Sequence, residues 1–252
     1  MSSLYWLTDE QMERLRRFFP KSHGKPRVDD RRVLSGIIFV NRNGLRWRDA
    51  PKDYGPAKTL YNRWKRWGAM GIFVRMMEGL AAAGAEPKTV MIDATYLKAH
   101  RTASSLRVKK GGFGRLIGRT KGGLNTKLHA VTDANGRPLS FFMTAGQVSD
   151  YTGAAALLDD LPKAQWLLGD RGYDADWFRD ALQAKGIQAC IPGRRSRLEP
   201  VRYDKRRYRR RSRIEIMFRR LKDWRRVAIR YDRCPAVFFS AIALAATVIF
   251  WL

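Results

Sequence analysis

The chain has 252 residues, enough for one medium-sized domain or for a larger domain with a small additional module. Hydrophobic residues make up 45% of it, which permits a sizeable buried core, but 50 Lys and Arg against 23 Asp and Glu leave a net charge of +27. Such an excess repels itself unless a polyanion neutralises it, which favours a nucleic-acid partner over an unspecific basic surface. Two cysteines without C-x-x-C spacing argue against a disulfide framework or a zinc site and fit a reducing cytoplasm.

Residues 4–84 carry the pattern of short helices joined by tight turns. Thr8 followed three residues later by Gln11 predicts a capping box at the start of the first helix. Four helices are predicted: one beginning after Thr8, one over 29–41, one over 57–67 and one through 76–80. The region resembles a helix-turn-helix module, and residues 81–88 form a suitable linker after it.

The helix predicted over 57–67 is a candidate DNA-reading helix. It carries four basic side chains that are expected to point outward: Lys58, Arg63, Lys65 and Arg66. Three aromatic residues lie beside them: Tyr61, Trp64 and Trp67. For any one of these residues the alternative is that the aromatic rings belong to the core and the charges to an ordinary solvated face.

From residue 89 onward the pattern changes to strands alternating with helices. Strands are predicted over 89–93, 165–170 and 187–192, helices over 150–161, 175–184 and from about 208, and a hairpin over 128–146 around Asn135-Gly136. This order predicts an α/β fold, a ribonuclease-H-like mixed sheet with flanking helices, preceded by a small all-α helix-turn-helix-like domain. The helical DNA-binding domain is expected over 1–85 and the ribonuclease-H-like catalytic domain over 86–252.

The last 19 residues, from Cys234 to Leu252, contain no charged side chain and are almost long enough to span a bilayer. The segment opens with Pro235, is rich in alanine and has no flanking anchor. We therefore predict a buried terminal helix packed closely on a sheet, with no contact to a membrane. The first 20 residues carry charge throughout and have no signal-peptide pattern, which favours a cytoplasmic location.

Two carboxylates occupy matching positions at the ends of predicted strands. Asp93 ends the apolar run VMID, and Asp170 ends WLLGD. Ligands and catalytic groups gather at strand ends in α/β sheets, and carboxylate oxygens are the donors that Mg²⁺ and Mn²⁺ prefer. Asp174 and Asp176 lie close to Asp170 and are rival ligands, although helix capping is the simpler explanation for both.

A third carboxylate lies in the arginine-rich helix predicted from about residue 208. On a continuous helix, one face within an arc of roughly 60° would carry Tyr208, Arg211, Glu215 and Lys222. An adjoining apolar stripe would dock on the sheet, formed by Ile214, Met217, Phe218 and Leu221. A surface salt bridge explains a glutamate among so many cations equally well, so this geometry leaves the role of Glu215 open.

Motifs along nearly the whole chain resemble those of one family. The spacing Tyr208-x2-Arg211-x3-Glu215-x6-Lys222 reproduces the Y-R-E-K signature around the glutamate of many insertion-sequence transposases. Further blocks resemble the same proteins: RWRDAPKDYGPAKTLYNRWKRW, MIDATYLKAHR at 91–101, GGLNTKLHAVTDANGRPL at 122–139 and GDRGYDAD at 169–176. The chain thus resembles the insertion-sequence-five family of transposases within the DDE class, with Arg171 where lysine is common in relatives.

The resemblance implies a metal-dependent enzyme that hydrolyses the phosphodiester at the ends of an insertion sequence and joins the 3′-hydroxyls to target DNA. Asp93, Asp170 and Glu215 would coordinate two Mg²⁺ or Mn²⁺ ions, and this role selects Asp170 over its two rivals. Side chains that would contact DNA near the site are Tyr208, Arg211, Lys222, His100 and Arg101. The implied partners are double-stranded DNA, as terminal inverted repeats and target, and a second copy of the chain, as a dimer or larger assembly on DNA in a bacterial nucleoid.

A glycine-rich basic loop at 107–123 contains no acidic residue and carries Lys109, Lys110 and Lys121. Such a loop can follow a phosphate backbone closely and would position DNA without reading its sequence. Two other interpretations of the chain remain open. The first is a DNA-binding regulator without catalysis, and the second is a ribonuclease-H-like nuclease that cleaves without joining.

Overall fold

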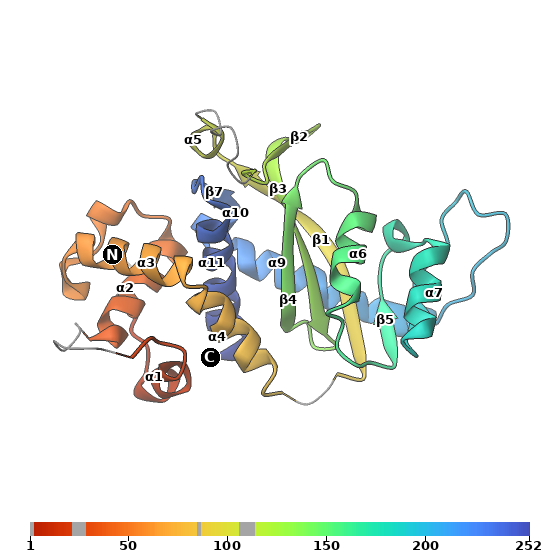
Figure 1. Ribbon diagram of the computed structural model, residues 1–252, viewed down its shortest axis with the longest axis horizontal. Coiled ribbons are helices and arrows are strands. Elements are labelled where there is room, and N and C mark those ends of the chain that lie inside the picture. Colours follow the sequence, from red (N-terminus) through yellow and green to blue (C-terminus); the bar gives the residue numbers. More distant parts are fainter. Residues whose placement is uncertain (1–2, 22–28, 85–86, 106–113) are drawn as a thin grey trace. The chain divides into compact units, whose positions relative to one another are not determined.

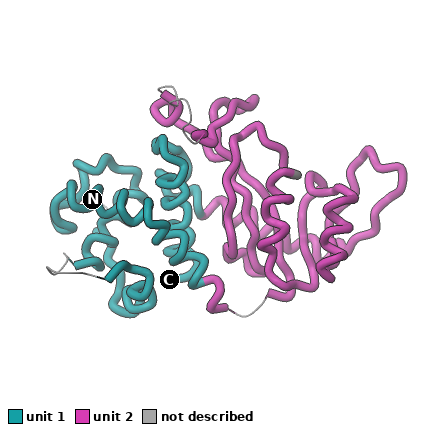
Figure 2. The backbone as a smooth tube through the Cα atoms, viewed as in Figure 1, with its two compact units in different colours: residues 1–80, 221–252 teal, residues 81–220 magenta. Residues whose placement is uncertain are grey.

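The computed structural model describes residues 3–21, 29–84, 87–105 and 114–252. The chain divides into two compact units, one formed by residues 1–80 together with 221–252 and the other by residues 81–220 (Figure 2). Residues 221–252, which sequence reasoning placed in the domain 86–252, thus pack with the N-terminal helices.

The first unit is helical. Its longer helices are α1 (Asp9–Arg16), α2 (Asp30–Asn43), α3 (Ala57–Ala69), α4 (Ile72–Ala81) and α11 (Pro235–Ala246), and a short helix α10 spans Arg225–Ala228. The predicted capping box is confirmed, because the Thr8 side chain accepts from the backbone N–H of Gln11 and the Gln11 side chain accepts from that of Thr8. Gly44, with φ of 69°, ends α2 in the left-handed conformation that favours glycine.

Helix α11 is buried, as predicted, but its partners are helices rather than a sheet. It packs on α2, α3 and α10 and continues into a π-helix over Thr247–Trp251. A Cβ added to Gly68 of α3 would lie 3.1 Å from the Oγ of Ser240, so glycine allows the two helices to approach closely. In the described part of the chain, no helix has the length and apolar character needed to cross a membrane.

The second unit contains a mixed sheet. Its strands are β1 (Thr89–Ala99), β2 (Gly118–Thr120), β3 (Gly123–Asp133), β4 (Pro138–Ala145), β5 (Trp166–Leu168) and β6 (Gln188–Cys190). Strand β3 pairs antiparallel with β1, β2 and β4, whereas β5 runs parallel to both β1 and β6. The predicted hairpin joins β3 and β4, and its Gly136 has φ of 80°.

Helices cover both faces of this sheet. In Figure 1, α6 (Asp150–Leu158) lies in front of the strands and α9 (Ser212–Lys222) runs behind them. A buried apolar cluster joins the sheet to α6 and α7 (Asp176–Ala184), and it contains Val90, Ile92, Leu157, Phe178 and Leu182 among others. A Cβ on Gly153 of α6 would lie 2.1 Å from the Nδ1 of His129 on β3, so α6 can sit this close only with glycine there.

The long helix predicted from about Tyr208 is divided into three pieces. They are α8 (Lys205–Tyr208), a 3₁₀ turn over Arg209–Arg211 and α9. Tyr208 and Arg211 therefore precede α9, but Arg211 still pairs with Glu215 four residues further on, as a helical repeat places it. The predicted apolar stripe of α9 is buried: Ile214, Met217, Phe218 and Leu221.

Candidate active site

The parallel pairing of β1 with β5 brings the first two carboxylates to the same level of the sheet. Met91 pairs with Leu168, and Asp93 and Asp170 each lie two residues further along. After β5 ends, the chain still runs close to β1. A Cβ added to Gly169 would lie only 3.2 Å from Cγ2 of Ile92. Asp170 then begins a 3₁₀ turn over Arg171–Tyr173, and its Oδ1 accepts from the N–H of Gly172 at 2.8 Å.

The expectation that both aspartates end strands is correct only for β5. Strand β1 continues six residues beyond Asp93, to Ala99, because β3 provides antiparallel hydrogen bonds along that stretch. Side chains alternate between the faces of a strand, and Val90 and Ile92 belong to the apolar cluster under α6 and α7. Asp93 is therefore directed to the opposite face, which α9 covers.

Arg211 joins the first and third carboxylates. Its Nη1 donates to Oδ2 of Asp93 at 2.7 Å, and its Nη2 donates to Oε1 of Glu215 at 2.5 Å. The side chains of Arg211 and Asp93 are each 15% exposed, whereas that of Glu215 is 44% exposed. The guanidinium thus lies between two carboxylates and compensates part of their combined negative charge.

Burial controls the electrostatics of Asp93. Desolvation raises the pKa of this carboxyl to about 6, with a further contribution from the nearby Asp170, and overcomes the opposing effects of Arg211 and of the Ala94 N–H. In the unfolded chain the same group titrates near 3.8. Between these two values the folded protein holds more protons than the unfolded one, so this group lowers the stability as the pH rises, and its penalty is complete above about pH 6.

We therefore expect Asp93→Asn to stabilise the chain when divalent metal is removed with EDTA. At pH 8 the free energy of unfolding should rise by about 1–3 kcal/mol, since a two-unit pKa shift corresponds to about 2.7 kcal/mol and the weaker bond to Arg211 offsets part of it. Urea denaturation at pH 8 and pH 4.5 measures the effect, and the gain should shrink at the lower pH. A variant less stable than the wild type at pH 8 would contradict the assignment of Asp93 as a destabilising buried charge.

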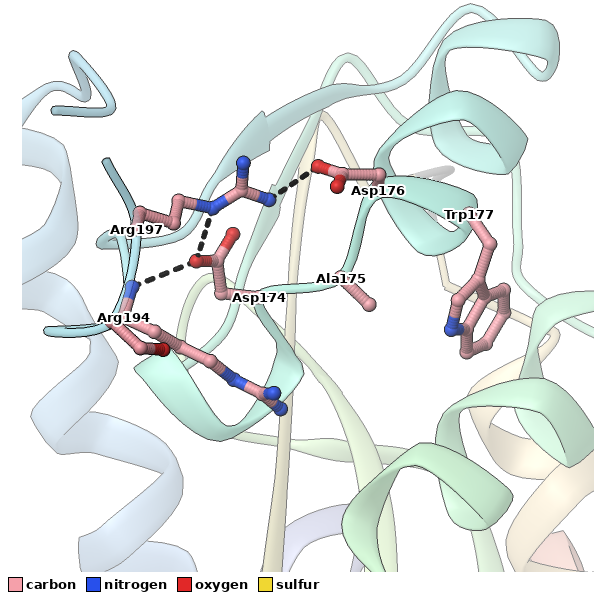
Figure 3. A pocket seen from close by; sticks show the side chains of 7 residues that line it. Asp174, Ala175, Asp176, Trp177, Arg194 and Arg197 are labelled. Atoms are coloured by element: carbon pink, nitrogen blue, oxygen red, sulfur yellow. Dashed lines mark hydrogen bonds and ion pairs between the residues drawn. The ribbon is translucent and has the colours of Figure 1, made fainter. Parts of the chain in front are cut away.

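The two rival aspartates are held by arginines (Figure 3). Asp174 is fully buried and accepts from Nε of Arg179 at 2.8 Å, Nε of Arg197 at 2.6 Å and the backbone N–H of Arg194 at 2.7 Å. Burial alone would raise the pKa of Asp174, but these donors together hold it below its usual range. Asp176 is exposed and pairs with Arg197. Both aspartates therefore have partners within the fold, and they line an open pocket together with Ala175, Trp177, Arg194, Ser196 and Arg197.

The other residues expected near the site lie in several places. Tyr208 is half-buried in α8 and packs edge-on against Tyr203, and Lys222 is the last residue of α9. His100 caps the short helix α5 (Arg101–Ser104), and its Nδ1 accepts from the N–H of Thr102. Arg101 and Lys121 are exposed, and Lys109 and Lys110 lie outside the described residues.

Helix α3 presents basic side chains much as the sequence suggested. Lys58, Lys65 and Arg66 are exposed, and Arg63 is half-buried with its guanidinium over the ring of Trp67 at 5.7 Å. The ring of Trp67, like that of Trp64, is buried in the first unit. Trp64 and Trp67 therefore belong to the core, which was the alternative considered from the sequence. Lys58, Lys65 and Arg66 form the exposed face of α3.

Sequence reasoning missed a second charged group beside Asp170. Lys127 of β3 is 5% exposed, and its Nζ donates to Oδ1 of Asp150 at 3.0 Å and to the carbonyl of Val148 at 2.6 Å. A lysine in the middle of a predicted strand was the only signal in the sequence for this ion pair. Its partner, the first residue of α6, has no equivalent signal in the sequence.

The donor set suits a hard divalent cation, since carboxylate oxygens dominate it. No three Asp, Glu, His or Cys side chains within the described ranges lie close enough together to hold one ion; instead, Arg211 supplies the positive charge between Asp93 and Glu215. The buried Tyr173 hydroxyl has no hydrogen-bond partner among the described residues and lies within electrostatic range of Asp93 and Asp170. The carboxylate chemistry of Asp93, Asp170 and Glu215 fits a divalent cation.

Comparison with known proteins identifies the two parts of the chain. Residues 7–77 match a family described as a putative transposase of the IS4/5 family, and residues 84–251 match the transposase DDE domain. A putative transposase for insertion sequence element IS6501 of Brucella ovis is 37% identical over 134 residues, which cover 51% of this chain and 99% of that protein. A putative transposase for insertion sequence element IS402 of Burkholderia cepacia is 32% identical over 141 residues, covering 50% and 63%.

Among solved structures, the piggyBac transposase synaptic complex with hairpin DNA matches in fold. The TM-score is 0.53 at 9% identity, and the match covers 97% of this chain and 72% of that one. The mixed sheet with flanking helices thus defines a ribonuclease-H-like protein, as the element order predicted. The family matches are more specific: the chain belongs to the DDE transposase family, whose members cleave DNA and transfer strands with divalent metal ions.

Proposed function

We propose that this transposase binds the terminal inverted repeats of an insertion sequence, hydrolyses the phosphodiester at its ends and joins the 3′-hydroxyls to target DNA. Asp93, Asp170 and Glu215 hold two Mg²⁺ or Mn²⁺ ions in this proposal, and the ions activate the attacking oxygen and stabilise the leaving one. The observation that carries it is the arrangement of the three carboxylates. Asp93 on β1 and Asp170 after β5 lie at the same level of the sheet. Glu215 is linked to Asp93 through Arg211.

Arg211 has two successive roles in this proposal. Without metal, its guanidinium binds both Asp93 and Glu215 and compensates part of their negative charge. A divalent cation at these carboxylates would repel the guanidinium, which would then give up at least one of its two bonds. The released donors suit a DNA phosphate, which planar guanidinium groups bind in a bidentate manner. Metal loading and phosphate binding would thereby be coupled through one side chain.

The helical region 1–85 is proposed to recognise the inverted repeats, with α3 as the reading helix. The exposed basic side chains of α3 support this role. Deletion of residues 1–80 is a poor test because α11 packs on α2 and α3 and would lose its cover. Point substitutions on the exposed face of α3 leave this packing intact. Assembly of at least two copies on DNA, within the nucleoid, follows from the need to pair two element ends.

Replacing the three exposed basic residues of α3 by alanine should therefore weaken binding to end DNA. We expect the affinity for a terminal-repeat duplex to fall about tenfold or more, and the salt dependence to become shallower by about 0.9 for each phosphate that the variant no longer neutralises. Fluorescence anisotropy at several salt concentrations measures both, with a random duplex in parallel. The changed residues are Lys58, Lys65 and Arg66, and the control set of equal charge is Arg14, Lys21 and Lys185. Equal effects of the two sets would exclude α3 as the reader.

The decisive experiment is a strand-transfer assay with Mg²⁺, labelled element-end DNA and a target plasmid. A transposase yields cleaved ends followed by joined product, and EDTA abolishes both. Cleavage without joined product would instead establish a nuclease. Binding without any reaction would establish a DNA-binding regulator.

A further inference from the structure

A fourth carboxylate, that of Asp150, lies near Asp170 at Gly172. A Cβ placed on Gly172 would lie 2.8 Å from Oδ1 of Asp170 and 3.6 Å from Oδ2 of Asp150. The two oxygens therefore face the same small space next to Gly172. Asp150 comes from the first residue of α6, a different element from those that carry the three expected ligands.

The other oxygen of Asp150 is already engaged. Its Oδ1 accepts from Nζ of Lys127, and this ammonium is held in turn by the carbonyl of Val148 and lies over the ring of Tyr96 at 5.1 Å. The N-terminus of α6 and the ammonium of Lys127 both stabilise a negative charge on Asp150. They do not account for the position of Oδ2, 3.6 Å from a Cβ built on Gly172, in the space that Asp170 also borders.

An independent observation points to a ligand in this place. The Tyr173 side chain is 1% exposed, and its hydroxyl has no hydrogen-bond partner among the described residues. Burial raises the pKa of this hydroxyl well above its usual range, and the charges of Asp150, Asp93 and Asp170 raise it further against the opposing effect of Arg211. A buried hydroxyl without a partner is unfavourable, and a polar ligand within its reach would remove that penalty.

We infer that Asp150 is an additional ligand of the active-centre metal. Its Oδ2 and Asp170 would hold one of the Mg²⁺ or Mn²⁺ ions, and Lys127 would keep Asp150 in place for this role. This inference rests on the proposed function, since it adds a ligand to the same metal centre. It also explains why a lysine is buried on β3, where it fixes the orientation of a ligand.

The test is a titration of the full-length chain with Mn²⁺, without DNA, in which free Mn²⁺ is followed by electron paramagnetic resonance. Asp150→Asn should weaken Mn²⁺ binding at least tenfold. The matched control is Asp160→Asn, which makes the same charge change at an exposed position just beyond the other end of α6 and should stay within twofold of the wild type. An Asp150→Asn affinity within twofold of the wild type would overturn the inference.

Asp150→Asn could weaken Mn²⁺ binding either by removing a ligand or by lowering the overall negative charge. Measuring the affinity at high salt distinguishes these two explanations. A long-range effect shrinks at 0.5 M KCl because the ions screen it, whereas the effect of a missing ligand persists. The tenfold weakening should therefore remain at 0.5 M KCl, and a reduction below twofold would overturn the inference. If Asp150→Asn leaves an unpaired Lys127 and unfolds the chain, the double variant Lys127→Met/Asp150→Asn removes both charges and is judged by the same limits.

Asp170→Asn distinguishes this inference from the proposed function. If Asp170→Asn abolishes Mn²⁺ binding and Asp150→Asn does not weaken it, only the role of Asp150 fails. If neither substitution changes Mn²⁺ binding, the proposed metal centre itself fails.

Discussion

Glu215→Gln is expected to reduce both DNA cleavage and strand transfer by about 10²–10³-fold, equivalent to roughly 3–4 kcal/mol of barrier. Glutamine keeps the size of the side chain and can still accept the hydrogen bond from Arg211, but it removes the negative charge that would bind a metal ion. Because the Glu215 side chain is 44% exposed, the fold should tolerate the change. The measurement is the initial rate of end cleavage in saturating Mg²⁺.

The matched control is Glu199→Gln, an equal charge change at an exposed residue of the same unit. It should leave the cleavage rate within about twofold, and both variants should bind end DNA as the wild type does. If Glu215→Gln retained activity within tenfold, or roughly 1.4 kcal/mol, Glu215 would not be a metal ligand.

Asp174→Ala is expected to have the largest effect on stability, a decrease of about 3–5 kcal/mol in the free energy of unfolding. The fully buried carboxylate binds Arg179, Arg197 and the N–H of Arg194, so its removal leaves two guanidinium groups without their main acceptor. The segment around Arg194 also contacts the turn after Asp170, since its guanidinium donates to the carbonyl of Gly172 at 3.1 Å. Urea denaturation at pH 7 followed by circular dichroism measures the decrease.

Asp176→Ala provides the control, because this carboxylate also pairs with Arg197 but is 79% exposed and should contribute no more than about 1 kcal/mol. The pH dependence gives a second check. The pKa of Asp174 is lowered on folding, so its contribution is present above the unfolded value and is lost as the pH falls through the lower folded value. Wild type and Asp174→Ala should therefore converge in strong acid. Equal destabilisation by the two alanine substitutions at pH 7 would show that the buried network is not the stabilising element.

Local chemistry in the sequence predicted the elements well. Thr8 and Gln11 specify a cap through hydrogen bonds between residues three apart, and Asn135-Gly136 specifies a turn through the backbone freedom of glycine. Local patterns also placed Asp170 directly after a buried strand. They were less successful where pairing with a distant segment decides the outcome, as at β1, whose second half exists because β3 lies beside it.

The sequence by itself determined the family, the order of helices and strands, and the identity of the carboxylates proposed as ligands, since these depend on residue types and spacings. Only the tertiary structure showed that Arg211 lies between Asp93 and Glu215, that the buried Asp174 is held by arginines, and that Asp150 lies near Asp170. Each of these interactions joins side chains from separate elements. The strength of each interaction depends on burial and on the distance between the side chains. The spacing of residues along the sequence specifies neither.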